Sequence, residues 1–493
     1  MNPLASGVMV FGVLAAAALS ASCGSAGAQP PQTTGDSRGA ASAQASLDWK
    51  SLEAPTLTDH VQLTSRDMFL KAGEAYFDPT GTWIIFQAVP VPTGGKTPEP
   101  FYSMYVAKLT KDMAGRIKGI EKPILVSPPG SYNTCGWFHP KQPYKIIFGS
   151  TLVPPSADQM SKFQVGQGRY QWSFPEETEV VERSVLEIFK DLTPNAPPVL
   201  WSQDATTPKP VFSRPDYDAE CSYSRNGRFI LYSHVREGRK AGGRADADIW
   251  VYDTQTSKQQ VLVNADGYDG GPFWAPDGKR ICYRSDRKGN DLLQVYVADL
   301  KFEGDVPTGV EHEYKITDND AVNWAPFWDV TGSYLIYGTS EVSHANYEIF
   351  AVDARAERLR SGATPSDLKR HRITSADGTD ILPVFSPEGR YMMWTAQRGP
   401  MVAGDQKPSS QLWIAQWNAG VSLFEPTPIG QDRAIEIAKA VAGEIAESKD
   451  SKITPKRDGE NWQIFIDRGH SAGDQCVVVV TPKGELKKLM RGQ

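Results

Sequence analysis

Side chains that carry a carboxylate or amide oxygen recur at one position of this 493-residue sequence, five residues before an aromatic residue. Two further carboxylates, Glu74 and Glu220, stand two residues beyond that position, on the same side of an extended chain. A sixth copy of the pattern, before Phe77, has Ala72 instead. The five oxygen-bearing residues are Asn133, Asp218, Asp269, Asn323 and Asp380.

Two kinds of chemistry are compatible with this pattern. Asp and Asn often accept hydrogen bonds from nearby backbone N–H groups, and here they would tie each loop to the strand that follows it. If equivalent positions instead face a common axis, at the mouth of a channel, the oxygens form a ring that repels itself. Such a ring favours a bound cation, such as Ca²⁺, or a basic group of a partner.

No complete catalytic or metal-binding motif accompanies these residues. The sequence lacks the Gly-x-Ser-x-Gly nucleophile motif, the His-Glu-x-x-His zinc motif and the phosphate-binding glycine-rich loop. Its seven histidines are scattered, and its later cysteines are too far apart in sequence for a zinc-binding pattern. We therefore predict no catalytic residue, no confident metal ligand and no cofactor other than Ca²⁺. These cysteines are Cys135, Cys221, Cys282 and Cys476.

The recurring residues belong to a hairpin pattern that the chain repeats. Each copy has an aromatic residue, a turn with Pro, Asn or Gly, and then alternating apolar residues, which is typical of a β-hairpin. A third short strand and, in five copies, a fourth follow. The hairpins begin near residues 75, 136, 221, 267, 326 and 383; the third strands are 102–109, 184–192, 247–255, 293–300, 347–354 and 411–418; the fourth strands are 123–127, 198–202, 260–264, 314–318 and 371–375.

The missing fourth strand of the last copy has a counterpart near the beginning of the chain. The segment 61–65, "VQLTS", has the character of a fourth strand but precedes the first hairpin. Because radial closure leaves few unpaired sheet edges, we expect this segment to pair with the last unit near Trp413. The sequence therefore predicts a mainly β protein in which residues 58–418 form a six-bladed β-propeller closed by an N-terminal strand.

The repeat "FWAPDGKRICYRSDRKGN", followed by "VYVADL", resembles that of the TolB-like propellers, a WD-like family. The resemblance covers roughly 360 residues and implies the propeller fold. It implies less about function, because such propellers serve many roles and some relatives carry a peptidase domain. TolB itself has an α/β domain before its propeller, whereas this chain has its extra segment afterwards, so the partners of TolB do not transfer directly.

The N-terminal segment is typical of export. An apolar stretch at 8–21 is followed by "AGA" at 26–28, which predicts a signal peptide over residues 1–28 and a periplasmic protein. Lipid attachment at Cys23, facing the periplasm, is the alternative. Residues 29–57 are small and polar and predict a flexible tether.

Two other segments carry predictions. The segment 150–183 is predicted to be a surface loop of the second blade, whose Tyr170, Trp172 and Phe174 either anchor a partner or pack on their own blade. Residues 419–493 are predicted to form a small α+β domain, at best PepSY-like. Its helix spans 431–448, with Ile435, Ala438, Ala442 and Ile445 on one face, and its strands lie at 461–469 and 476–489.

These features favour a binding protein over an enzyme. The net charge of −6 and the scattered basic residues give no case for binding nucleic acid, and contact with a membrane is expected only through Cys23. We predict an exported, non-enzymatic, monomeric cell-envelope propeller that binds proteins or peptides on a propeller face or at its channel mouth. The alternative is a metal-assisted hydrolase or lyase that acts on carbohydrate or peptide at the channel mouth.

Overall fold

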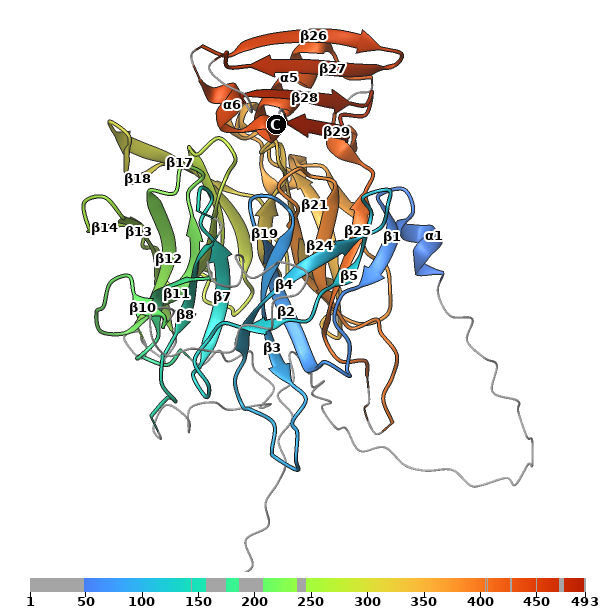
Figure 1. Cartoon of the computed structure of the whole chain (residues 1–493). Coiled ribbons are helices and arrows are strands. Elements are labelled where there is room, and N and C mark those ends of the chain that lie inside the picture. Colours follow the sequence, from blue (N-terminus) through green and yellow to red (C-terminus); the bar gives the residue numbers. More distant parts are fainter. Residues whose placement is uncertain are drawn as a thin grey trace, which may run out of the picture.

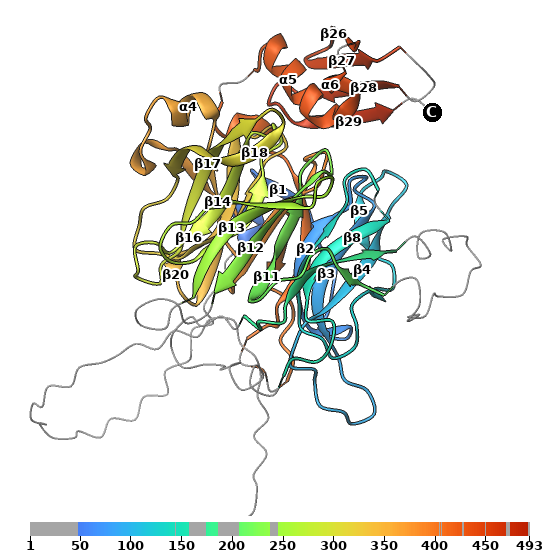
Figure 2. The same ribbon diagram turned by 90° about the vertical axis from the view of Figure 1, so that its left-hand side faces the viewer.

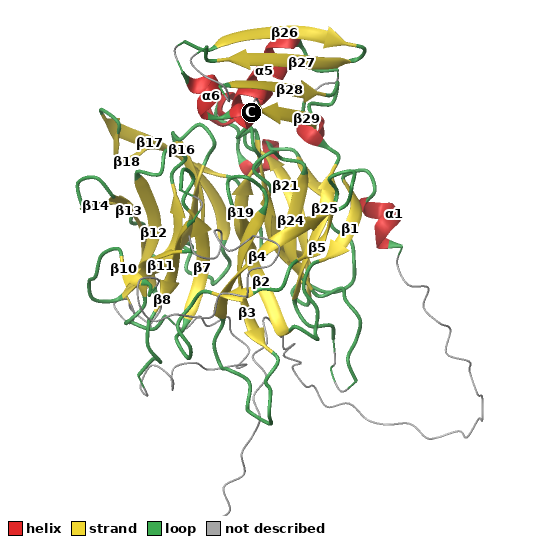
Figure 3. Ribbon diagram, viewed as in Figure 1, coloured by secondary structure: helices red, strands yellow, loops and turns green. Residues whose placement is uncertain are grey.

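The computed structural model describes residues 48–142, 144–156, 174–185, 207–236, 245–403, 405, 407–425, 428–448, 450–469 and 474–491. The described chain is mainly β, as predicted, and consists of antiparallel sheets with a few short helices (Figure 3). None of the helices in these ranges has the length and apolar character needed to cross a membrane. The predicted signal peptide, Cys23, Tyr170 and Trp172 lie outside the described residues.

Six sheets precede residue 418 in the described chain, and they are numbered here by the order of their first strands. Within each sheet, neighbouring strands are antiparallel. The first contains β2 (Phe69–Phe77), β3 (Trp83–Pro90), β4 (Ser103–Lys111), β5 (Ile117–Ile120) and β6 (Ile124–Leu125); the second β7 (Asn133–Phe138), β8 (Lys145–Ser150), β9 (Glu179–Ser184) and β10 (Lys209–Pro210); the third β11 (Tyr217–Tyr223), β12 (Phe229–Arg236), β13 (Asp246–Asp253) and β14 (Lys258–Val263).

The remaining three sheets follow the same plan. The fourth contains β15 (Asp269–Trp274), β16 (Arg280–Ser285), β17 (Gln294–Glu303) and β18 (Val306–Lys315); the fifth β19 (Asn323–Trp328), β20 (Tyr334–Ser343), β21 (Asn346–Asp353) and β22 (Arg370–Arg372); the sixth β23 (Asp380–Phe385), β24 (Tyr391–Ala396), β25 (Gln411–Trp417) and β1 (Leu57–Gln62). In the sixth sheet Gln62 lies opposite Trp413, so an early strand pairs with a late one.

In five of the six sheets the first hairpin depends on a glycine at its turn. Sequences such as "PTGT" and "PDGK" place a glycine in the left-handed region, which other residues rarely adopt. Gly81 and Gly278 have φ values of 64° and 65°, and the alternating apolar residues on either side then pair as neighbouring strands. The equivalent glycines are Gly81, Gly227, Gly278, Gly332 and Gly389.

The first strands of the six sheets, called the inner strands here, meet at the centre of the molecule. They are β2, β7, β11, β15, β19 and β23, and each contacts the next in this order, with β23 contacting β2. Tyr76, Trp137, Phe273 and Phe327 project from four of them and form an aromatic layer, with ring centroids 4.9–6.5 Å apart. Most of the core lies between neighbouring sheets, for example between the fourth and fifth.

The C-terminal part forms a separate sheet at one end of the six (Figures 1 and 2). After the short helix η2 (Gly420–Leu423), α5 (Gln431–Ala442) and α6 (Glu444–Glu447) precede β26 (Lys452–Asp458), β27 (Asn461–Asp467), β28 (Gln475–Val480) and β29 (Leu486–Arg491). Helix α5 packs on β27 and β28 around Ile437, Ile464 and Val478.

Several predicted boundaries are wrong. The third strand of the second sheet is β9, not 184–192, so part of the predicted loop 150–183 is a strand. The first sheet has an additional strand, β5, and the C-terminal sheet has an additional strand, β26. The predicted helix 431–448 is interrupted at Gly443, whose φ of 66° is incompatible with a continuous helix.

The predicted tether also ends earlier than expected. Residues Trp49–Glu53 form α1, and residue 57 already belongs to β1. The Glu53 side chain is fully buried and binds Arg398 and His60, and its Oε1 also accepts from the Ser375 N–H. A sequence prediction of flexibility from small polar residues missed this contact because it depends on Arg398, which is 345 residues away.

Candidate functional site

A β-bulge occupies the same position in all six inner strands. At each bulge the register shifts and one residue has a positive φ, between 48° and 60°. Five of the six residues are not glycine, and such a residue is strained in this region, which is a common property of binding sites. A bulge also turns a side chain away from strict alternation. The six residues, called the bulge residues here, are Glu74, Cys135, Glu220, Gly271, Ala325 and Leu382.

The first two bulge residues are joined by a hydrogen bond. The Cys135 thiol donates to Oε1 of Glu74 at 2.8 Å, and the hydroxyl of Tyr76 donates to the same oxygen at 3.2 Å. The backbone N–H of Glu74 donates to Oγ1 of Thr395 in the sixth sheet, at 3.0 Å. The Glu74 side chain therefore lies where the first, second and sixth sheets meet.

The third bulge residue, Glu220, is neutralised by an arginine from the fourth sheet. Nη2 of Arg284 lies 3.0 Å from Oε1 of Glu220 and 3.0 Å from the hydroxyl of Tyr268, which also donates to Glu220. Arg284 reaches this position because Gly271 has no side chain: a Cβ there would lie 2.0 Å from Nη1 of Arg284. We call Glu74, Cys135, Glu220 and Arg284 the central cluster.

Burial favours the protonated forms of the Glu74 carboxyl and the Cys135 thiol. Burial raises the pKa of the Glu74 carboxyl, and the nearby Glu220 adds to this effect, whereas the Cys135 thiol and Arg284 oppose it. Burial and the adjacent Glu74 also raise the pKa of the Cys135 thiol well above its ordinary value. A thiol with a raised pKa is a weak nucleophile, so Cys135 acts here as a hydrogen-bond donor.

A half-buried lysine, Lys71, lies on the same inner strand as Glu74. The Nζ atom of Lys71 is 4.3 Å from the centroid of the Tyr102 ring, a cation–π contact, and burial lowers its pKa to about 8. Burial and, to a lesser degree, the charge of Glu74 raise the pKa of the Tyr102 hydroxyl. The neighbourhood of the central cluster thus combines carboxylates with tyrosine rings and one weakly basic amine.

The five predicted ring residues lie elsewhere, inside their own sheets. All five are buried, with at most 1% of each residue exposed. Each bonds to its own sheet or to a loop beside it: Oδ1 of Asn133 accepts from Ser150, and Oδ1 of Asn323 accepts from Thr339. The geometry agrees with the interpretation that these residues tie the loops, and it does not bring together the alternative, an oxygen ring at the channel mouth formed by Asn133, Asp218, Asp269, Asn323 and Asp380.

Three of these residues pair with arginines that the sequence reasoning missed. Asp218 binds Arg214 and His234, Asp269 binds Arg287, and Asp380 binds Arg398. In the last two pairs the arginine follows the aspartate by 18 residues, and this shared spacing could have revealed both pairs. Despite Arg287, burial raises the pKa of Asp269 to about 6.

Of the seven residues predicted to face the channel mouth, only Glu74 and Glu220 belong to the central cluster. The bulge between Ala219 and Ser222 separates the environment of Glu220 from that of Asp218, two residues earlier. Strict alternation had predicted that both lie on one side of the strand, and the bulge makes that prediction wrong. Cys135 and Arg284 were not predicted, although Cys135 stands at the position equivalent to Glu74.

Phe174, the one described residue of the predicted partner loop, is not available to a partner. It is 4% exposed and packs edge-on against Tyr217 and parallel to Tyr268, with ring centroids 5.0 and 5.9 Å apart. The alternative interpretation, packing on the protein itself, is therefore correct for Phe174. No group of three or more potential ligands suited to a metal ion occurs within the described ranges, and Ca²⁺ stays a prediction.

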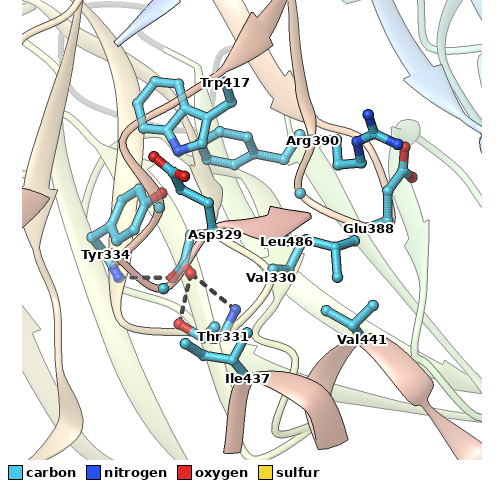
Figure 4. A pocket seen from close by; sticks show the side chains of 15 residues that line it. Asp329, Val330, Thr331, Tyr334, Glu388, Arg390, Trp417, Ile437, Val441 and Leu486 are labelled. Carbon is cyan, nitrogen blue, oxygen red and sulfur yellow. Dashed lines mark hydrogen bonds between the residues drawn. The ribbon is translucent and has the colours of Figure 1, made fainter. Parts of the chain in front are cut away.

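A small cleft lies between the fifth and sixth sheets and the C-terminal part (Figure 4). Glu388 and Arg390 line one side, and Ile437, Val441 and Leu486 line the other. The space that water-sized molecules can occupy is about 30 Å³, enough for roughly two waters. This cleft is a packing boundary and too small for a peptide or sugar.

Comparison with known proteins supports the predicted resemblance to TolB. The chain is 26% identical over 311 residues to the Tol-Pal system protein TolB of Wolinella succinogenes, an alignment that covers 59% of this chain and 66% of TolB. It is 23% identical over 182 residues to the uncharacterized peptidase YuxL of Bacillus subtilis, covering 30% of this chain and 25% of YuxL. The TolB-like character predicted from the repeats is confirmed, although the chain spans only part of both relatives. No family model matches the sequence.

Solved structures give distant similarities. TolB from Acinetobacter baumannii is 15% identical, with a TM-score of 0.40 and coverage of 69% of this chain and 64% of that one. A protein of unknown function from Dyadobacter fermentans is 13% identical, with a TM-score of 0.44 and coverage of 73% and 98%. Both TM-scores are below 0.5, so the architecture described above rests on the strand pairing itself.

Proposed function

We propose that the protein is an exported cell-envelope β-propeller that binds a protein or peptide partner without chemical turnover. Residues 58–418 are the six-bladed propeller, closed by the pairing of β1 with β25, and residues 419–493 are a small accessory domain. The cyclic contacts of the inner strands support six blades. The N-terminal residues 1–28 act as a signal peptide, with lipid attachment at Cys23 as the alternative.

The observation that carries the proposed binding role is the charge balance of the central cluster. Two carboxylates, Glu74 and Glu220, share one guanidinium, that of Arg284. Within the described part of the chain, no cationic side chain forms an ion pair with Glu74, whose side-chain partners are Cys135 and Tyr76. We infer that the cluster binds a basic group of the partner, a lysine or arginine side chain or an N-terminal amine.

The chemistry of the surroundings suits such a group. A guanidinium or ammonium forms charge-assisted hydrogen bonds with carboxylates, and it also packs favourably on the faces of aromatic rings. Tyr76 and Tyr268 bond directly to the two carboxylates, so their rings adjoin the proposed site. Tol-Pal proteins are candidate partners only by analogy with TolB, and the C-terminal position of the accessory domain sets this chain apart from TolB.

Affinity capture from an envelope extract tests the proposal. The wild-type chain and the variant Glu74→Gln/Glu220→Gln are used as baits, and the captured proteins are quantified by mass spectrometry. We expect a specific partner to be captured by the wild type and lost, by about tenfold, with the variant. The control Lys258→Glu, an exposed change on β14, should leave capture unchanged; equal capture by all three baits would contradict the proposed site.

The alternative function is a metal-assisted hydrolase or lyase. Its motivation is the presence of acidic residues near the centre and the match to a peptidase, YuxL, although the alignment covers only a quarter of that protein. Turnover of a peptide or polysaccharide library that requires an added divalent cation and is abolished in Glu74→Gln would favour the enzyme. Turnover that is absent under all conditions, together with partner capture, would favour binding.

A further inference from the structure

The C-terminal sheet has one face that is covered by helices and one that is not. Ile464, Ile466 and Val478 point toward α5 and form the buried core. The intervening residues point the other way, and Phe465, with 38% of its surface exposed, lies at the middle of this outer face. Val477 and Met490 lie beside it, since Phe465 is opposite Val477 and Val477 is opposite Met490.

Lysines border this apolar centre on both sides. Lys452 and Lys456 stand on β26, two residues before and after Thr454, the partner of Phe465. Lys488 stands on β29, two residues before Met490. All three are exposed, and within the described chain none forms an ion pair; the Asp467 carboxylate opposite Lys452 accepts instead from the Gly469 N–H and from Gln475. We call Phe465, Val477, Met490 and these three lysines the outer face.

The charge of this part of the chain differs from the rest. Residues 451–493 contain eight Lys and Arg against five Asp and Glu, a formal net charge of +3, whereas the whole chain carries −6. Residues 1–450 carry the remaining formal charge of −9, so the strands of the C-terminal sheet are locally basic. A basic rim around a half-exposed apolar centre is complementary to an acidic ligand that also carries apolar side chains.

We propose that the outer face binds an extended acidic peptide segment of a partner protein, with apolar side chains on Phe465 and carboxylates on Lys452, Lys456 and Lys488. A protein segment fits better than a membrane surface. Membrane-binding elements insert protruding apolar side chains into the headgroup layer, whereas the apolar residues here lie within a flat sheet. Pro455 lacks an N–H on the edge strand β26, so the ligand lies across the face instead of extending the sheet.

The test uses two synthetic 13-residue peptides and the full chain. The first peptide alternates Glu with Leu and Phe, and the second has Lys in place of each Glu. Binding is measured by fluorescence anisotropy at 50 and 300 mM salt. We expect the acidic peptide to bind, to bind less tightly at the higher salt because its charges are screened, and the basic peptide not to bind.

Matched variants distinguish the outer face from general charge. Lys452→Glu/Lys456→Glu/Lys488→Glu should weaken binding of the acidic peptide about tenfold or more, and Phe465→Ser should do so without changing net charge. The control Lys258→Glu/Lys301→Glu/Lys369→Glu makes the same change of charge at exposed propeller positions and should have little effect. Circular dichroism and thermal unfolding establish that each variant is folded.

Three outcomes would overturn the proposal. The first is equal weakening by the two triple variants, which would indicate non-specific attraction. The second is no binding of the acidic peptide by the folded wild-type chain. The third is binding of vesicles that contain anionic lipid, lost in Phe465→Ser, without binding of the peptide, which would assign the outer face to a membrane. None of these readouts depends on Glu74 or Glu220, so the proposal is tested independently of the central cluster.

Discussion

The first three inner strands and the last three have the same backbone at their bulges but different side chains. The bulge residues of the first half are Glu74, Cys135 and Glu220, and those of the second half are Gly271, Ala325 and Leu382. All six have a positive φ, so the bulge belongs to the repeat and not to any one side chain. The bulge therefore does not require the polar residues of the first half, because the second half forms the same bulge with Gly, Ala and Leu.

The two halves meet at Arg284. This residue belongs to the fourth sheet, but it crosses the space left by Gly271 to bind Glu220 in the third. An apolar half thus supplies the only guanidinium shown to bind the acidic half within the described central cluster. The difference teaches that the polar cluster occupies one side of a repeated backbone framework, and its proposed role can be tested at each position.

The largest effect is expected for Gly271→Val. The new side chain would displace the guanidinium of Arg284, which is 7% exposed, and would leave Glu220 without its cation. Removing one partner of a buried ion pair costs about 3–5 kcal/mol, so we expect a loss of this size in the free energy of unfolding. Urea unfolding measures it. Gly309→Val, at a strand position with open space, is the control, and similar stabilities of the two variants would refute the packing argument.

A smaller effect is expected for Glu74→Leu, which gives the first sheet the side chain that Leu382 has at the equivalent position of the sixth sheet. Glu74→Leu removes the carboxylate that lacks a cation, so affinity for a partner that presents a basic group should fall about tenfold, or about 1.4 kcal/mol. The free energy of unfolding at pH 7 should also fall, by about 1–3 kcal/mol, because the Cys135 thiol and the Tyr76 hydroxyl lose their acceptor. Surface plasmon resonance with the captured partner measures the affinity. Unchanged affinity would show that both halves are structural.

A pH effect is expected at Asp269, one of the loop-tying residues. Burial raises the folded-state pKa of Asp269 to about 6, above the ordinary aspartate value of 3.8, so between these values the native state retains a proton that the unfolded state has lost. Its contribution therefore lowers stability as the pH rises from about 4 to about 6, by at most about 1.4 kcal/mol per pH unit. Asp269→Asn copies Asn323, the equivalent residue of the fifth sheet, and should remove this slope. Urea unfolding at pH 4, 5, 6 and 7 measures it, and an unchanged slope would mean that other groups cause the dependence.

The smallest effect is expected for Ala325→Gly. Glycine adopts a φ of 52° without strain, which offsets the lost methyl group and the greater freedom of the unfolded chain. We expect the free energy of unfolding to change by less than about 1 kcal/mol. Ala351→Gly, at a fully buried position in β21, has no strain to relieve and should be the more destabilising of the two. Equal losses in thermal unfolding would show that the bulge is not strained.

The sequence predicted the repeating part of the fold because its signals are local. A glycine turn between alternating apolar runs identifies a hairpin without reference to the rest of the chain, as at Gly278. The third strand of the second sheet was harder: β9 (Glu179–Ser184) begins inside the segment predicted as a loop, and the apolar pattern at 184–192 competes with it. Helix α5 was found from its apolar face, but its end at Gly443 was missed because the apolar pattern continues to Ile445.

The site was predicted less well, for a geometric reason. Equivalent positions of a repeat do share a location, as expected, but the repeated Asp and Asn residues face inward to their own sheets, for example toward Ser150 and Thr339. The residues that meet near the centre are set by a bulge, and nothing in a period-two pattern reveals a bulge at Glu74 or Cys135. Arg284 reaches the cluster across a neighbouring sheet, a contact that depends on the absence of a side chain at Gly271.

The pairing of β1 with β25 has a consequence for biosynthesis. Leu412 donates its N–H to the hydroxyl of Thr64, 348 residues earlier, so the sixth sheet cannot be completed until nearly the whole propeller has been made. Contacts between such distant residues are slow to form. Until β25 is made, β1 lacks its only neighbour in the described sheet, so its edge stays open to pairing with another chain.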